Sequence, residues 1–215
     1  MVKIMNKKWI ISNCVASSKS NGGDDFIAIK HFNDEFKLFF LADGATGAGN
    51  GKAAAKILYD ICVKELFNCK TFDEVTSKMS DTLLLADKEI KQKILYADTT
   101  AILLAVQEDK YAISSVGDSE AWMISGSTFK YLTYQQRKKP RIGSGAKIPL
   151  VDSGTIEGPI LIFSDGLRHA LPEHASWFKY SHKPDNWANL LLLDALDKWS
   201  NELPDDLSVI TATYQ

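Results

Sequence analysis

The sequence is poor in the side chains that cross-link small proteins or bind transition metals. Its 215 residues include three cysteines, Cys14, Cys62 and Cys69, and only four histidines. An odd number of cysteines without ligand-like spacing argues against a disulfide framework and against a structural zinc site. We therefore expect reduced thiols and a cytoplasmic location.

A strong net charge and long apolar runs are also absent. The formal net charge is only −2, so the chain has no overall positive field that would attract nucleic acid or an anionic membrane. No apolar run reaches the ~18 residues of a membrane span, and the N-terminal residues lack the pattern of a secretion signal. We expect no nucleic-acid partner and no membrane partner. Arginine is scarce too, since 22 of the 25 basic residues are lysine.

The composition that remains is that of an ordinary globular protein. It is 45% hydrophobic and 24% charged, and no internal repeat or linker-like tract interrupts it. A chain of this length suits one large domain or two small ones. Because no boundary is visible, we expect a single domain over residues 1–215.

The hydrophobic pattern groups strands and helices into separate blocks. We expect strands at residues 9–16, 26–32, 36–42, 99–106, 111–116, 121–124, 128–132, 159–164 and 207–213, and helices at residues 52–67, 72–94, 173–180 and 185–199. The four strands between residues 99 and 132 read as an antiparallel meander, and residues 134–158 as a loop with a short strand. Blocks of this kind favour an α+β fold over a doubly wound parallel sheet.

Aspartates recur where the predicted strands begin or end. These residues are Asp24, Asp25, Asp43, Asp118, Asp165, Asp205 and Asp206. A single Asp-Gly pair is a common turn signal, but the strand ends of one sandwich converge on a common rim. Hard divalent cations prefer several carboxylate oxygens, with main-chain carbonyls and water. The pattern therefore predicts magnesium or manganese rather than zinc, with two ions that clamp a phosphoryl group.

Six short motifs follow one another along the chain. They are Gly23-Asp24-Asp25-Phe26, Ala42-Asp43-Gly44-Ala45, Thr99-Thr100-Ala101, Val116-Gly117-Asp118-Ser119, Phe163-Ser164-Asp165-Gly166-Leu167 and Asp205-Asp206-Leu207-Ser208-Val209. Their order resembles that of the metal-dependent protein phosphatases of the PPM (type 2C) family, in its compact bacterial form. The resemblance implies a four-layer αββα sandwich, with two antiparallel sheets flanked by helices. It also implies a serine/threonine protein phosphatase of bacterial signalling.

The resemblance implies that Asp43, Asp165 and Asp205 are catalytic because they hold Mg²⁺ or Mn²⁺. Asp43 would bridge two ions, and the carbonyl of Gly44 would bind one of them. Asp165 and Asp205 would complete the first ion's ligands. A metal-activated water would attack the phosphorus of phosphoserine or phosphothreonine, with no covalent enzyme intermediate.

Three further positions take supporting roles by the same resemblance. Asp24 would bind the second ion directly or through water. Asp25 would not bind metal itself but would orient the metal-bound water. Asp118 would help to hold a weak third ion. The implied partner is a phosphorylated protein, either a serine/threonine kinase or the target of one.

Departures from the family pattern keep other functions open. The arginine that grips phosphate in the family is Ser20 here, so Lys19, Arg137 or Arg141 would have to bind the phosphate. An acid that serves the third ion is replaced by His169, a titratable ligand whose role is open. The alternative to an enzyme is a pseudophosphatase that binds phosphoproteins without turnover.

Two experiments would distinguish an active phosphatase from the alternatives. Replacing Ser20 with arginine would raise the turnover of an enzyme that lacks only phosphate capture. Small phosphorylated metabolites are a third possible class of substrate, and their hydrolysis would be compared with that of phosphopeptides.

The basic run at residues 135–141 fits either a solvated loop or a binding surface for an acidic or phosphorylated partner.

Overall fold

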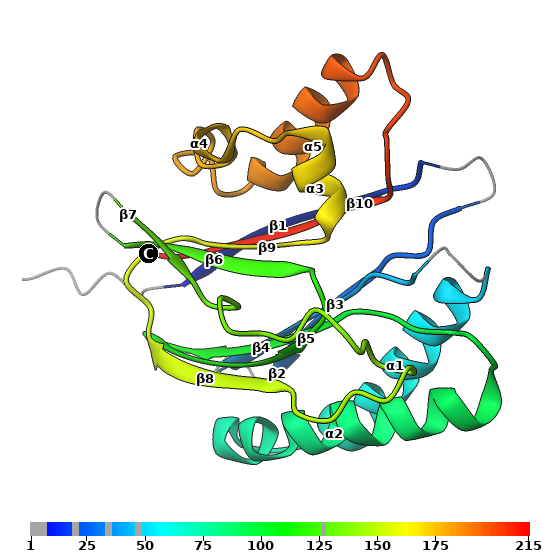
Figure 1. Cartoon of the computed structure of the whole chain (residues 1–215). Coiled ribbons are helices and arrows are strands. Elements are labelled where there is room, and N and C mark those ends of the chain that lie inside the picture. The colour runs from blue at the N-terminus through cyan, green and yellow to red at the C-terminus, as the bar shows by residue number, and fades with distance from the viewer. Residues whose placement is uncertain (1–7, 19–21, 33–35, 46–48, 126–127) are drawn as a thin grey trace, which may run out of the picture.

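Two antiparallel sheets of five strands each form the centre of the molecule (Figure 1). The computed structural model describes residues 8–18, 22–32, 36–45, 49–125 and 128–215. The first sheet has the strand order β1 (Trp9–Ala16), β10 (Leu207–Tyr214), β9 (Ile160–Phe163), β6 (Glu120–Ser125) and β7 (Thr128–Tyr131). The second has the order β2 (Phe26–Phe32), β3 (Phe36–Ala42), β4 (Ala101–Gln107), β5 (Lys110–Val116) and β8 (Leu150–Thr155).

Helices cover the outer face of each sheet (Figure 1). The first sheet carries α3 (Asp165–Ala170), α4 (His174–Trp177) and α5 (Trp187–Lys198), and the second carries α1 (Gly51–Leu66) and α2 (Phe72–Lys93). The predicted four-layer αββα sandwich is confirmed. Among the described residues, no helix combines the length and the apolar composition that crossing a bilayer requires.

Three apolar cores lie between the four layers, and strand periodicity explains how one strand divides its residues between two of them. Every residue of β3 is buried, because this central strand is covered on both faces. Leu38 and Phe40 face the core against α1 and α2, whereas Phe39 and Leu41 face the core between the sheets. Trp122, Trp177 and Trp187 fill the third core, beneath α3 to α5.

The predicted meander of four strands is wrong. β4 and β5 pair within the second sheet, whereas β6 and β7 pair within the first. The chain crosses between the sheets at Gly117, whose φ of +115° is left-handed and whose added Cβ would lie 2.7 Å from the side chain of Thr100. This close approach directs Asp118 toward the rim between the sheets instead of into a hairpin.

The sequence pattern also missed α3, which begins at Asp165 directly after β9. The helix has six residues, of which Gly166, Leu167 and Ala170 are buried. A segment this short does not complete enough turns to show a helical period. The short strand expected within residues 134–158 is present as β8.

Candidate metal centre

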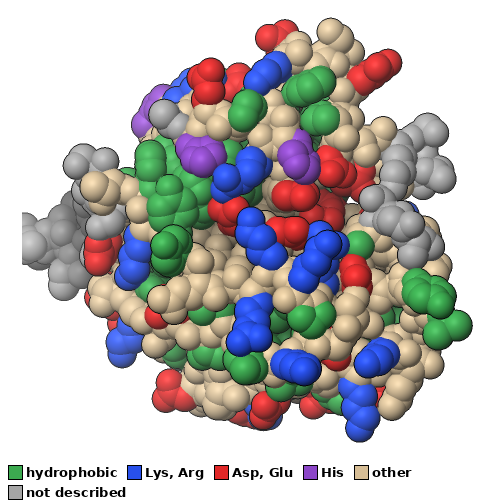
Figure 2. Space-filling view, in the orientation of Figure 1, with side chains coloured by type: hydrophobic (Ala, Val, Ile, Leu, Met, Phe, Trp, Pro, Cys, Tyr) green, Lys and Arg blue, Asp and Glu red, His purple; other side chains and the backbone are tan. Residues whose placement is uncertain are grey.

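The predicted aspartates come from both sheets and meet at one rim of the sandwich. Asp43 follows β3 of the second sheet, while Asp165 follows β9 and Asp205 precedes β10 of the first. The negative charges of Asp25, Asp165, Asp118 and Asp205 all act on Asp43. Figure 2 shows acidic side chains gathered at the junction of the two layers, bordered by basic and histidine side chains.

Two threonines at the start of β4 fix the main chain of Asp43. Its N–H donates to Thr100 Oγ1 at 3.0 Å, and its carbonyl accepts from Thr100 N at 2.8 Å and from Thr99 Oγ1 at 2.9 Å. The Thr100 hydroxyl also lies 2.6 Å from Ser119 Oγ, beside Asp118. Three of the six motifs are therefore joined directly by hydrogen bonds around Asp43.

Gly44 is needed for the close approach of α1 to this loop. A Cβ on Gly44 would lie 2.3 Å from the carbonyl carbon of Gly51, the first residue of α1. The N–H of Gly44 donates to the carbonyl of Asp24 at 3.3 Å. The backbone of Gly44 thus joins the Asp24 segment to the start of α1, with no room for a side chain.

Replacing Gly44 with alanine should destabilise the fold by about 3 kcal/mol, because the new methyl would overlap backbone atoms that cannot rotate away. Urea unfolding of the metal-free protein measures this loss. Gly49→Ala is the matched control: nothing lies within 4 Å of its Cβ position, although its φ is +76°. That variant should lose only about 1 kcal/mol from left-handed strain. Equal losses in the two variants would contradict the packing argument.

Burial and mutual repulsion raise the pKa values of the clustered carboxyl groups. Burial, together with the negative charge of Asp25 and of the other acids, raises the pKa of Asp43 to about 10. Burial also raises the pKa of Asp25 to about 6, and burial with the charge of Asp205 raises the pKa of Asp165. Both carboxylate oxygens of Asp25 are buried, and the hydroxyls of Ser164 and Ser208 are among the neighbours that favour its ionised form. Such oxygens fit hard dications like Mg²⁺ and Mn²⁺.

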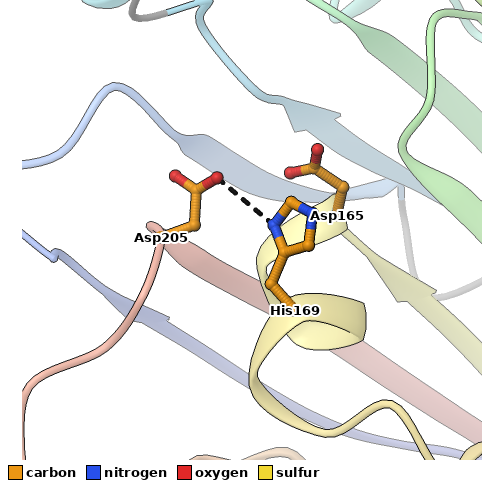
Figure 3. A group of neighbouring side chains, drawn as sticks. All are labelled: Asp165, His169 and Asp205. Carbon is orange, nitrogen blue, oxygen red and sulfur yellow. Dashed lines mark ion pairs between the residues drawn. The ribbon is translucent and has the colours of Figure 1, made fainter.

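His169 lies beside two of the predicted ligands (Figure 3). It follows Asp165 by one helical turn on α3, and its Nδ1 is 3.4 Å from Asp205 Oδ2. One ligand atom from each of Asp165, His169 and Asp205 lies within 4.8 Å of the other two. His169 therefore belongs to the rim rather than to an unrelated part of the surface.

Asp206 is a residue of the site that sequence reasoning left without a role. It is 4% exposed, and its Oδ1 accepts from Ser18 N at 2.8 Å, Ser18 Oγ at 2.9 Å and Ser17 Oγ at 3.2 Å. Its Oδ2 accepts from Asp24 N at 2.7 Å. Burial opposes ionisation, but these hydrogen bonds hold the pKa of Asp206 below its ordinary value. The one available signal was the second acid in the Asp205-Asp206 pair.

Replacing Asp206 with alanine should loosen the Asp24 segment, because it removes the acceptor for all these donors. We expect a loss of about 1–3 kcal/mol of stability and a Mn²⁺ affinity lowered ~10-fold through the misplaced Asp24. Asp206→Asn should fall between the wild type and Asp206→Ala, since its amide nitrogen cannot accept from Asp24 N. Calorimetric titration with Mn²⁺ ranks the three proteins, and wild-type affinity in the alanine variant would contradict the role.

Of the predicted phosphate-binding residues, Arg141 lies beside Asp118 with its side chain, and Arg137 contacts the neighbouring Gly117 with its main chain. Arg141 Nη2 lies 2.9 Å from Asp118 Oδ2, so this guanidinium is already paired. The carbonyl of Arg137 accepts from Gly117 N at 3.0 Å, and the residue is exposed. Lys19 and Ser20 lie outside the described residues.

Comparison with known proteins agrees with this architecture. Residues 12–140 match the family model of protein phosphatase 2C. Among curated protein sequences, none matches this chain significantly.

Several solved structures share the fold. A bacterial serine phosphatase has a TM-score of 0.81 at 18% identity, with 95% of this chain and 97% of that chain covered. The catalytic domain of the serine/threonine protein phosphatase PstP, in complex with 2 manganese ions, has a TM-score of 0.79 at 15% identity over 97% and 99%. The serine/threonine phosphatase Stp1 from Staphylococcus aureus has a TM-score of 0.79 at 17% identity over 95% and 94%. The family match and this shared compact form lead to one conclusion: the chain belongs to the protein phosphatase 2C family.

Proposed function

We propose that the protein is a Mg²⁺- or Mn²⁺-dependent phosphatase that removes phosphate from phosphoserine and phosphothreonine in proteins. One observation carries the proposal: Asp43 is buried, and the negative charges of four other aspartates disfavour its ionised form. Repulsion of this size is costly unless cations neutralise it. The family match supports the same chemistry.

The proposed ligands divide between two ions. Asp43 would contact both ions. Asp165 and Asp205 would bind the first ion and Asp24 the second, and the carbonyl of Gly44 would bind one of the two. When bound, the ions supply Lewis acidity toward the phosphoryl oxygens and lower the pKa of coordinated water. Asp25, with both carboxylate oxygens buried, would orient that water.

The chain itself supplies a rigid frame for this chemistry. Thr99 and Thr100 hold the main chain of Asp43, and Asp206 holds that of Asp24. Carboxylates fixed in this way need little rearrangement when the charge of the transition state develops. Lys19 and Arg137 remain the candidates for binding the substrate phosphate.

The biological setting is proposed on the same basis. A phosphorylated kinase, or the target of a kinase, is the partner that a protein phosphatase in bacterial signalling requires. The three cysteines are buried free thiols, in keeping with the predicted cytoplasmic location. The described elements pack as one sandwich, which supports a single domain over residues 1–215.

A binding module without turnover is the second candidate. It is favoured by Arg141, because a guanidinium engaged by Asp118 is not free to grip a phosphate in the fork geometry that arginine provides. In this case metal would still bind, and phosphoproteins would bind without hydrolysis.

The deciding experiment is hydrolysis of a phosphothreonine peptide by the purified protein with Mn²⁺, followed by excess chelator. Phosphate release that stops on chelation supports the enzyme. No release, in protein whose melting temperature still rises with Mn²⁺, favours the binding module. A small phosphate ester tested in parallel separates phosphoprotein from metabolite substrates: faster release from the ester than from the peptide would favour metabolites.

A further inference from the structure

A guanidinium group is built into the carboxylate cluster. Arg141 Nη2 is 2.9 Å from Asp118 Oδ2, and Arg141 Nη1 is 3.7 Å from Asp98 Oδ1. The three side chains are 22%, 22% and 27% exposed, so these contacts are only partly open to solvent. Charge pairs with this degree of burial are screened less by salt than surface pairs. Arg141 thus brings a fixed positive charge to the same acid that the motif comparison assigned to a metal.

Hydrogen bonds to Thr99 fix the main chain next to Arg141 beside the metal centre. Ile142 exchanges two hydrogen bonds with Thr99, at 2.9 and 3.0 Å, and Thr99 in turn pairs with Gly44. The Arg141 segment therefore lies directly beside Thr99, whose hydroxyl donates to the carbonyl of Asp43. Its guanidinium is positioned by the same hydrogen-bonded layer as the predicted ligands.

A buried acid on α2 fixes the following turn. Asp87 Oδ1 accepts from the N–H groups of Gly143, Gly145 and Ala146 at 2.7, 2.9 and 2.9 Å. Gly143 has a φ of +101°, and a Cβ there would lie 2.4 Å from the carbonyl oxygen of Ala97. The turn after Arg141 is held on both of its sides, which restricts how far the guanidinium can move away from Asp118.

Among the described residues, two further groups of this part of the rim already have partners. Asp98, the second acid beside Arg141, also accepts a hydrogen bond from Ser144 Oγ. His169, which stands where the family has an acid, lies against Asp205. Asp118 Oδ1 and Asp98 Oδ1 are buried without a hydrogen-bond partner in the described part of the chain, but the guanidinium of Arg141 contacts both of these carboxylates. A dication next to Asp118 would therefore compete with a tethered guanidinium for the same two carboxylates.

We propose that Arg141 is the resident cation of Asp118, so that the centre holds two metal ions and Asp118 binds none. This rests on the proposed two-ion centre. Arg141 is then a positioning and charge-balancing residue, and the centre needs no third ion at ordinary metal concentrations.

The test is the number of Mn²⁺ ions bound by the purified chain, measured by calorimetric titration and by electron paramagnetic resonance of free Mn²⁺. We expect two in the wild type, two in Arg141→Lys, which keeps the charge, and a third, weaker ion in Arg141→Gln. Adding Asp118→Asn to Arg141→Gln should return the number to two. Three ions in the wild type, or two in Arg141→Gln, would overturn the proposal.

Circular dichroism establishes that each variant is folded before titration. If Arg141→Gln does not fold, Asp118→Asn in the wild-type background decides the matter. It should keep both ions, whereas loss of an ion would make Asp118 a ligand and refute the inference. Failure to bind any Mn²⁺ would instead refute the proposed function, so the two failures are distinct.

Discussion

Asp43→Asn should abolish Mn²⁺-dependent phosphate release and, at the same time, make the metal-free fold more stable. Activity should fall at least ~1,000-fold, which corresponds to about 4 kcal/mol of transition-state stabilisation. The loss is expected because the amide cannot bridge two dications. The gain in metal-free stability, about 2 kcal/mol near neutral pH, is expected because Asp43, with its raised pKa, must take up a proton when the metal-free chain folds, whereas asparagine is neutral in both states.

Two measurements on one preparation separate these effects. Peptide hydrolysis reports the chemistry, and urea unfolding in chelator reports the metal-free fold. Asp60→Asn is the matched control, because Asp60 lies on the outer surface of α1 with a side chain 57% exposed. That control should change neither quantity measurably. Full activity in Asp43→Asn would remove the two-ion assignment, and a destabilised metal-free fold would show that Asp43 supports the structure in another way.

Much of this arrangement was predictable from the sequence because it depends on local pattern. Strands β3 and β4 are apolar apart from Lys37 and Gln107, since they lie between two covered faces. Acids directly after apolar strands, such as Asp43 after β3 and Asp165 after β9, can be placed on one rim of the sandwich by strand geometry alone.

The contacts that complete the site were beyond sequence reasoning, because they join distant segments. Ser18 and Asp206 are separated by 188 positions, and Arg141 and Asp118 by 23. Nothing in the spacing shows that an arginine from a polar loop will pair with an acid expected to bind metal. The crossing at Gly117 was missed for a similar reason, since a short turn between two strands looks like a hairpin until the partner strands are known.

The metal-free protein should lose stability as the pH rises from 5 to 8. The folded-state pKa is about 10 for Asp43 and about 6 for Asp25, and that of Asp165 is also raised, whereas these groups titrate near pH 4 in an unfolded chain. The folded state therefore retains protons that the unfolded state releases. The stability that these protons provide is fully present below about pH 4 and is lost as the pH rises through the folded-state values, by about 1.4 kcal/mol per pH unit for each proton that the folded state retains.

His174 opposes this slope within the window, because burial lowers its pKa and its contribution to stability therefore rises with pH. One such group is outweighed by the protons that Asp43, Asp25 and Asp165 retain. The pKa of Asp206 is lowered in the folded state, so its contribution is present above about pH 4 and is lost only at more acidic pH, outside the window. Bound Mn²⁺ takes the place of the retained protons, because it neutralises the same oxygens. The rise in melting temperature caused by Mn²⁺ should therefore increase steadily from pH 5 to pH 8.

Melting curves at four pH values, with chelator and with Mn²⁺, measure both slopes. Asp43→Asn should flatten the metal-free slope, because it removes the acid with the largest rise in pKa. A metal-free melting temperature that stays level or increases over this window would mean that the carboxylates are not held close together. Protein that melts identically with and without Mn²⁺ at pH 8 would mean that the cluster does not hold metal. Arg141 forms its ion pairs with Asp118 and Asp98 rather than with Asp43. Asp43 therefore needs either a proton or a bound cation to offset the charges around it, and this is why the stability of the fold should depend on bound cations.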